Sequence, residues 1–181
     1  MTKDSVTIKR WVRWLGTFIA FPLAGVGARL AVGNIDSASA AVLGGLVGGT
    51  VLGGLQVVIG GIDRADRFRW ISATALGLAA GLGVGASAVG YRTDTASLAV
   101  MGAVSGAFVG LAQAGSIPMR LIDRLLWATI TPALWAGGWL ISAQVIVDAD
   151  RQHAIFGSSA AIVVAALSGV LHVTRRRPAV A

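Results

Sequence analysis

Three polar side chains in otherwise apolar stretches are the strongest candidates for chemistry in this sequence. Gln56, Gln113 and His172 each lie near the end of a segment that is almost free of charge. A polar group in hydrocarbon needs a hydrogen-bond partner, and Thr74 and Thr131 are expected at a similar depth. We therefore predict a polar layer made of these five residues. It serves either as a structural clamp that fixes helix register or as a site for a substrate or an ion.

The residue types that most enzymes use are scarce in this chain. Cysteine and glutamate are absent, and no aspartate lies within an apolar stretch. These absences exclude thiolate chemistry and an intramembrane pair of carboxylates. The two histidines, His153 and His172, are expected on opposite sides of the membrane, which argues against a haem held by both. We predict no enzymatic activity, no metal and no cofactor.

Charge is distributed as it is in membrane proteins. Only 13% of the residues are charged, whereas about 25% is usual in soluble domains. The charges cluster between apolar stretches of about 20 residues, the length that crosses a bilayer. We predict six transmembrane segments, at about residues 14–32, 39–59, 70–89, 96–114, 125–147 and 154–173.

Basic residues predict the orientation of these segments. Twelve fall on one side, namely Lys3, Lys9, Arg10, Arg13, Arg64, Arg67, Arg69, Arg120, Arg124 and Arg175 to Arg177. Three fall on the other side, namely Arg29, Arg92 and Arg151. Because basic loops stay in the cytoplasm, we predict a multi-pass protein of the cell's inner (plasma) membrane with both termini cytoplasmic. The same rule accounts for the net charge of +7 without a nucleic-acid partner.

The chain aligns with itself when it is shifted by 57 positions. Gly45, Gly49, Gly53, Gln56, Asp66, Arg67, Trp70 and Thr74 fall on Gly102, Gly106, Gly110, Gln113, Asp123, Arg124, Trp127 and Thr131. A fainter third copy has Ala161, Ala165, Gly169 and His172 at the same spacing. We predict a single all-α membrane domain, 1–181, with three repeat units at about 10–59, 66–116 and 123–174. Its six transmembrane helices would form three tandem helical hairpins around a pseudo-threefold axis.

The repeated glycines and tryptophans have expected roles of their own. Small residues spaced by four share one helix face and allow close helix packing, so Gly45, Gly49, Gly53, Gly102, Gly106, Gly110 and Gly169 are predicted packing positions. The alternative is that they line a pore or a flat ligand. Trp14, Trp70 and Trp127 lie near basic residues, which is typical of anchors at the membrane interface.

One combination of these motifs resembles a known group. Gly49, Gly53 and Gln56 form G-x-x-x-G-x-x-Q, and an arginine-containing loop separates them from R-W-x-x-x-T-A-L-G at 69–77. The combination resembles uncharacterised bacterial multi-pass membrane proteins, which implies a helical membrane fold and no particular chemistry. Size and helix number are also similar to substrate-binding subunits of energy-coupling-factor vitamin transporters, from which the threefold repeat departs.

Two functions remain after these exclusions. The first is a non-enzymatic accessory or scaffold subunit of a membrane complex, whose partners are lipids and other membrane-protein chains or further copies of itself. The alternative is a small-solute transporter or channel whose polar site, made by Gln56, Gln113 and His172, lies near the cytoplasmic side. A water-accessible cavity at that layer would favour transport, whereas a closed axis would favour the scaffold.

Overall fold

The computed structural model describes residues 3–145 and 157–174, and every regular element within these residues is a helix. In chain order the elements are α1 (Lys3–Leu15), the 3₁₀ helix η1 (Gly16–Ile19), α2 (Ala20–Val32), α3 (Ala38–Gly60), the 3₁₀ helix η2 (Arg64–Asp66), α4 (Arg67–Ala88), α5 (Thr95–Ser116), α6 (Leu121–Val145) and α7 (Ser158–Thr174). The predicted all-helical class is thus confirmed for the described residues.

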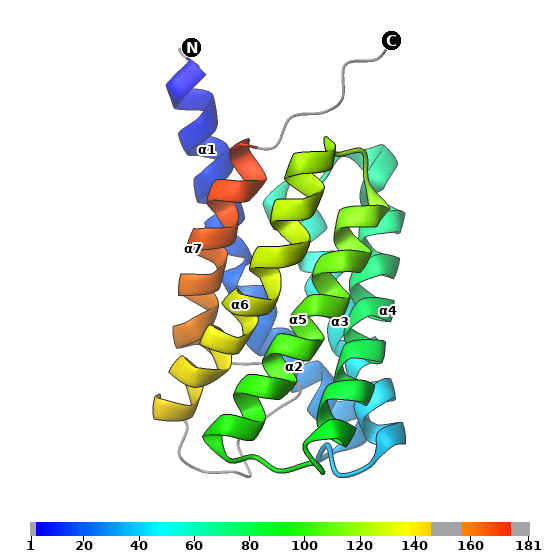
Figure 1. Ribbon diagram of the computed structural model, residues 1–181. Coiled ribbons are helices and arrows are strands. Elements are labelled where there is room, and N and C mark those ends of the chain that lie inside the picture. The colour runs from blue at the N-terminus through cyan, green and yellow to red at the C-terminus, as the bar shows by residue number, and fades with distance from the viewer. Residues whose placement is uncertain (1–2, 146–156, 175–181) are drawn as a thin grey trace.

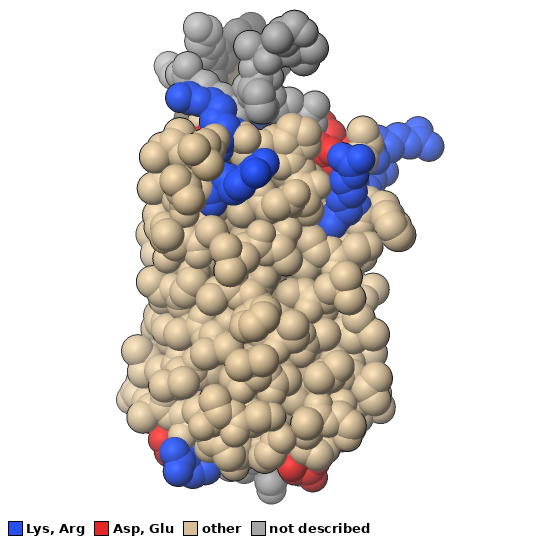
Figure 2. Space-filling view, turned by 45° about the vertical axis from the view of Figure 1, so that its right-hand side comes forward, with Lys and Arg blue, Asp and Glu red and all other residues tan. Residues whose placement is uncertain are grey.

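Five helical stretches of the described chain are long and apolar enough to cross a membrane. The first joins α1, η1 and α2, and the other four contain α3, α4, α5 and α6. On the face seen in Figure 2, charged side chains gather at the two ends and leave a broad uncharged band between them. Length, composition and this charge distribution together indicate a membrane protein.

The structure describes the sixth predicted segment only in part. α7 has 17 residues, which is about 26 Å at 1.5 Å per residue and less than the roughly 30 Å of a hydrocarbon core. The segment was predicted over 154–173, and its first residues fall in 146–156, outside the described part of the chain.

The helices pack side by side in a bundle (Figure 1), and their contacts follow one another in a ring. α2 contacts α3, and α3 through α6 each contact the next helix along the chain. α6 contacts α7, and α7 returns to α1. The ring is therefore closed by a contact between the first and last helices, and the start of α1 and the end of α7 lie at the same end of the bundle.

Pro22 explains the short 3₁₀ turn inside the first helical stretch. Proline has no N–H to donate to the carbonyl of residue 18, and its ring crowds that carbonyl. The preceding residues, Gly16–Ile19, form η1. The Thr17 hydroxyl donates to the Trp14 carbonyl at 2.6 Å. Ser5–Val32 nevertheless forms one helical stretch, in which Ile19 and Ala20 keep helical backbone angles.

Local capping sets several of the helix ends. The carboxylate of Asp94 accepts hydrogen bonds from the Ser97 hydroxyl at 2.6 Å and the Ser97 N–H at 3.0 Å, which caps α5. The hydroxyl bond, followed by the N–H bond and the nearby Arg92 charge, lowers the pKa of Asp94 below 3.8. At the other end of the bundle, Gly61 closes α3 with a φ of +77°, and the Arg13 guanidinium donates to the Ile59 carbonyl beside it.

Candidate functional site

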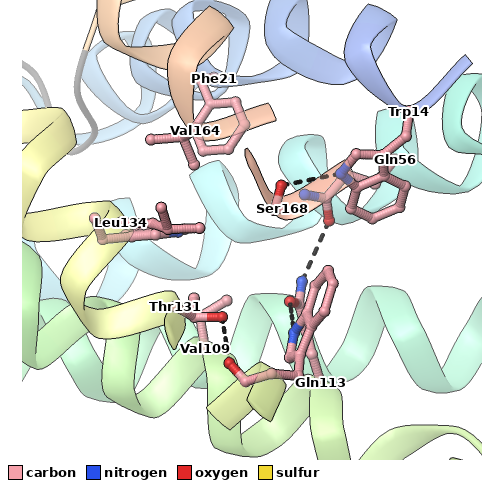
Figure 3. A pocket seen from close by; sticks show the side chains of 11 residues that line it. Trp14, Phe21, Gln56, Val109, Gln113, Thr131, Leu134, Val164 and Ser168 are labelled. Carbon is pink, nitrogen blue, oxygen red and sulfur yellow. Dashed lines mark hydrogen bonds between the residues drawn. The ribbon is translucent and has the colours of Figure 1, made fainter. Parts of the chain in front are cut away.

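The structure brings the polar residues of α3, α4 and α5 into direct contact. Gln113 Nε2 donates to Gln56 Oε1 at 3.2 Å and to Thr74 Oγ1 at 2.9 Å. Figure 3 shows the two glutamines facing each other across the interior of the bundle. Both glutamines are at least 95% buried, and Thr74 is fully buried. These three residues form the core of the polar layer.

Tryptophan side chains complete the layer and were not predicted to do so. Trp70 Nε1 donates to Gln56 Oε1 at 3.0 Å, and Trp127 Nε1 donates to Gln113 Oε1 at 3.1 Å. An indole N–H can only donate, so each bond fixes which end of the carboxamide is the oxygen. The orientation of both glutamines is thereby determined by their tryptophan partners. The available signal in the sequence was the distance of 14 residues from glutamine to tryptophan, which occurs twice.

The predicted role of Trp14, Trp70 and Trp127 as interface anchors is not what the structure has. Their exposed fractions are 1%, 0% and 4%. Their rings pack edge to face with centroid distances of 5.8 to 6.1 Å, so each ring contacts the other two. We call these residues the tryptophan cluster. Their basic neighbours suggested a lipid boundary, but each indole N–H has an acceptor inside the bundle.

The contact between α7 and α1 differs in its side-chain bonds from the contacts of α3 with α4 and of α5 with α6. Trp14 Nε1 donates to Ser168 Oγ at 3.0 Å, where the other tryptophans bind glutamine. The His172 ring stacks on Trp14 with a centroid distance of 3.9 Å and an interplanar angle of 16°. His172 is 2% exposed. The sequence did not indicate Ser168, because the matching positions of the first two repeats are the apolar residues Leu52 and Val109.

Thr131, the remaining predicted member of the polar layer, has a more limited role. Its hydroxyl donates to the Trp127 carbonyl at 2.6 Å, as the Thr74 hydroxyl donates to the Trp70 carbonyl at 2.8 Å. Within the described residues Thr131 forms no hydrogen bond with a glutamine, whereas Thr74 accepts from Gln113. Each threonine hydroxyl therefore donates to a carbonyl of its own helix, and Thr74 also accepts a hydrogen bond from Gln113 of α5.

Glycines of α3 lie directly against the backbone of α4. A Cβ atom built on Gly45 would lie 2.6 Å from the Leu78 carbonyl oxygen. One built on Gly49 would lie 2.6 Å from the Ala75 Cα and 2.7 Å from the Thr74 carbonyl oxygen. One on Gly53 would lie 3.0 Å from the Thr74 Cβ. A side chain at these positions would push the two helices apart, and with them the polar layer.

Glycines of α5 meet α6 at positions that are shifted by the same 57 residues. A Cβ on Gly102 would lie 2.8 Å from the Trp135 carbonyl oxygen. One on Gly106 would lie 2.9 Å from the Thr131 carbonyl oxygen, and one on Gly110 would lie 2.9 Å from the Thr131 Cβ. The carbonyl and Cβ contacts of α5 with α6 are therefore the equivalents of those of α3 with α4, but side-chain atoms of Trp139 and Trp135 also lie against Gly102 and Gly106.

On α7 the corresponding small residues are also buried, but they meet side chains. Ala161 is 0% exposed and Ala165 is 1% exposed. A Cβ on Gly169 would lie 3.1 Å from ring atoms of Trp11 and Trp14. Side chains move more easily than backbone, so this helix contact is less restrictive than the other two.

A small cavity lies next to the polar layer and the tryptophan cluster. Its volume is about 20 Å³, which is room for about one water molecule. The polar side chains that line it are Gln56, Gln113, Thr131 and Ser168, together with the indoles of Trp14 and Trp127. Figure 3 shows the cavity bounded on the other side by apolar residues such as Phe21, Leu134 and Val164.

The chemistry available at this site is neutral hydrogen bonding. Amides, hydroxyls and indoles supply donors and acceptors, with His172 as the one titratable side chain of the layer. Among residues 3–145 and 157–174, no group of three His, Cys, Asp or Glu side chains is placed to hold a metal ion.

Comparisons with protein-family models, with curated proteins and with solved structures found no match for this chain.

Proposed function

We propose that this chain is a non-enzymatic, multi-pass protein of the bacterial inner membrane that acts as an accessory or scaffold subunit of a membrane complex. The observation that carries the proposal is the closed interior at the polar layer. Gln113 uses both N–H groups on Gln56 and Thr74, and its oxygen on Trp127. A binding layer for a solute would leave such groups facing a cavity of solute size, whereas here they bind one another.

The tryptophan cluster supports the same conclusion. Three indoles in mutual contact lie beside the polar layer, and all three are at least 96% buried. The adjacent cavity, at about 20 Å³, is far below the roughly 300 Å³ at which small-molecule sites begin. The interior is built as a rigid support, which leaves the outer surface of the bundle for partners.

That outer surface is strongly apolar. Leu30, Val58, Leu76, Leu111 and Leu167 are all more than half exposed, and they come from five different helices. Lipid tails cover such side chains, and so do the helices of another membrane chain or a second copy of this one. Orientation with both ends of the chain in the cytoplasm follows from the basic residues at that end, including Arg13, Arg64 and Arg67.

The proposal includes the pseudo-threefold arrangement of three tandem hairpins, with repeat units at about 10–59, 66–116 and 123–174. Neighbouring hairpins then meet through three equivalent helix contacts: α3 with α4, α5 with α6, and α7 with α1. The arrangement is supported by glycine contacts and tryptophan bonds that recur 57 residues apart in the first two. Superposition of the three hairpins in an experimental structure should require successive rotations of about 120° about one axis. Rotations far from this value would remove the threefold arrangement and leave a twofold repeat.

Affinity purification from native membranes tests the scaffold role. A tagged chain extracted in a mild detergent should retain a reproducible membrane-protein partner or further copies of itself. The Gln56→Leu/Gln113→Leu double variant should retain the same partner when it is folded, because the interior is not the binding surface. Recovery of the chain as a monomer without protein partners, after crosslinking in the membrane, would contradict the proposal.

The alternative is a transporter or channel that uses the polar layer. The one observation in its favour is that the cavity is lined by Gln56, Gln113 and Ser168. Under this alternative the double variant would lose substrate while its assembly remained unchanged.

A further inference from the structure

One hydrogen-bond donor of the polar layer has no partner among the residues that the structure describes. Gln56 Oε1 accepts from Trp70 and from Gln113, which fixes Nε2 as the other end of the carboxamide. No hydrogen bond is formed by Gln56 Nε2 within these residues, although Gln56 is only 5% exposed. An amide left unsatisfied in an apolar interior costs about 1–3 kcal/mol.

The equivalent donor on α5 is fully satisfied, which makes the difference informative. Gln113 Nε2 donates to Gln56 Oε1 and to Thr74 Oγ1. Residue Thr17 lies 57 positions before Thr74, but its hydroxyl is bonded to the Trp14 carbonyl and receives nothing from Gln56. The donor of Gln56 therefore faces the place where the ring of helices closes.

A polar cavity lies at that place. Gln56 lines it, together with Ser168 and Thr131. The Ser168 oxygen accepts one hydrogen bond, from Trp14, and keeps capacity for another. The Thr131 hydroxyl donates to the Trp127 carbonyl, and its oxygen is likewise able to accept. The cavity thus offers one donor side chain and two acceptors within a volume of about 20 Å³.

We propose that this cavity is a binding site for a single structural water molecule, which accepts from Gln56 Nε2 and donates to Ser168 Oγ and Thr131 Oγ1. A buried water typically requires two to four polar partners and about 10–15 Å³ of accessible volume, and this cavity meets both conditions. A cation is disfavoured because the unsatisfied group is a donor. The water links α3 to α6 and α7. It completes the polar layer at Gln56 Nε2, which lacks the direct side-chain hydrogen bonds that Gln113 Nε2 forms.

Filling the cavity with a larger side chain tests the proposal, because the Tm should fall if water is bound there and rise if it is not. Val164 and Val109 line the cavity from α7 and α5, and Val164→Ile or Val109→Ile adds one methyl group toward it. If the methyl displaces a bound water, Gln56 Nε2 loses its partner, and the Tm should fall by about 2–4 °C for a chain of this size. If the cavity is dry, the added methyl fills empty space, and the Tm should rise instead.

Controls and a direct observation complete the test. Val163→Ile, next to Val164 on the exposed side of α7, should leave the Tm unchanged. An experimental structure in lipid that resolves ordered water should show a density peak within hydrogen-bond distance of Gln56 Nε2 in the wild type and none in Val164→Ile. A raised Tm in both filled variants, or a wild-type density map without a peak beside Gln56, overturns the proposal.

Discussion

The contacts of α3 with α4 and of α5 with α6 differ from the contact of α7 with α1 in the groups that touch. In the first two, glycine lies against backbone, and a tryptophan N–H binds a glutamine 14 residues earlier. In the third, Gly169 lies against tryptophan rings, and Trp14 binds Ser168 across 154 residues of chain. In the third contact the His172 ring stacks on Trp14, whereas in the other two a glutamine side chain accepts a hydrogen bond from the tryptophan.

The difference relates the closeness of helix packing to the separation of the two helices along the chain. A short loop joins α3 to α4 and another joins α5 to α6, so these pairs form by local folding, which costs little loop entropy. Backbone contacts at 2.6 to 2.9 Å from a notional Cβ can be maintained there. The α7–α1 contact joins segments from opposite ends of the described chain, and its adaptable side-chain contacts tolerate a less exact fit. The cavity beside Gln56 lies at this closing contact.

The largest expected effect comes from adding a methyl group between paired backbones. Gly49→Ala and Gly106→Ala should each destabilise the protein by about 3 kcal/mol, because the new Cβ would overlap backbone atoms that cannot move without separating the helices. Denaturant titration in mixed micelles, followed by tryptophan fluorescence, measures this change.

Gly54→Ala is the matched control for these variants. Gly54 lies in the same helix as Gly49, but a Cβ there meets nothing within 4 Å. Because alanine favours the helix, this variant should be neutral or more stable by up to about 1 kcal/mol. Equal losses in Gly49→Ala and Gly54→Ala would mean that the close contact of α3 with α4 is not present.

A smaller effect is expected from removing one glutamine. Gln113→Leu leaves the buried Trp127 N–H without its acceptor, which should cost about 2 kcal/mol. Ser168→Ala removes the acceptor of Trp14 at the closing contact, where the bond is only partly buried, and should cost about 1 kcal/mol. The same titration ranks the two, and the reverse order would contradict the view that the closing contact is the more adaptable one.

Gly169→Ala should be milder than its counterparts on α3 and α5. The added Cβ would meet the rings of Trp11 and Trp14 at 3.1 Å, and rings can shift by a few tenths of an ångström. A loss of about 1 kcal/mol is expected. Tryptophan fluorescence should report a changed environment of Trp14, and a loss as large as that of Gly49→Ala would show that the closing contact is as rigid as the others.

The smallest effect lies at the opposite end of the bundle. The hydrogen bonds from Ser97 lower the pKa of Asp94, so they stabilise the fold above the unfolded pKa and are lost as the pH falls through the folded pKa, below 3.8. The Tm of the wild type should therefore decline on acidification more than that of Asp94→Asn. Parallel pH profiles of the two proteins would mean that this helix cap does not contribute.

Much of the fold was predictable because it depends on patterns that repeat along the chain. The apolar stretches gave the helices, and the shift of 57 residues brought Gly45 onto Gly102 and Gln56 onto Gln113 before any contact was known. These patterns identify which helix faces are alike. They do not identify the partner of each face, and the closest backbone contacts join α3 to α4 and α5 to α6, across the boundaries of the units predicted at 10–59 and 66–116.

The candidate site was predicted only in part. Gln56, Gln113 and Thr74 were expected near one another because scarce polar residues at one depth must find partners. The buried place of Trp70 was missed, because basic neighbours give the same signal for an interfacial indole and for one that turns inward. Ser168 was missed because a single serine in an apolar helix has no distinguishing pattern.

Solute flux through liposomes that contain the purified protein tests the central claim most directly, namely that the Gln56–Gln113 layer closes the interior and leaves function to the outer surface. Wild-type protein should pass small neutral solutes and monovalent ions no faster than protein-free liposomes, and Gln56→Leu/Gln113→Leu should give the same rate. A wild-type flux clearly above the protein-free rate, abolished in the double variant, would contradict the claim and establish the polar layer as a conducting site.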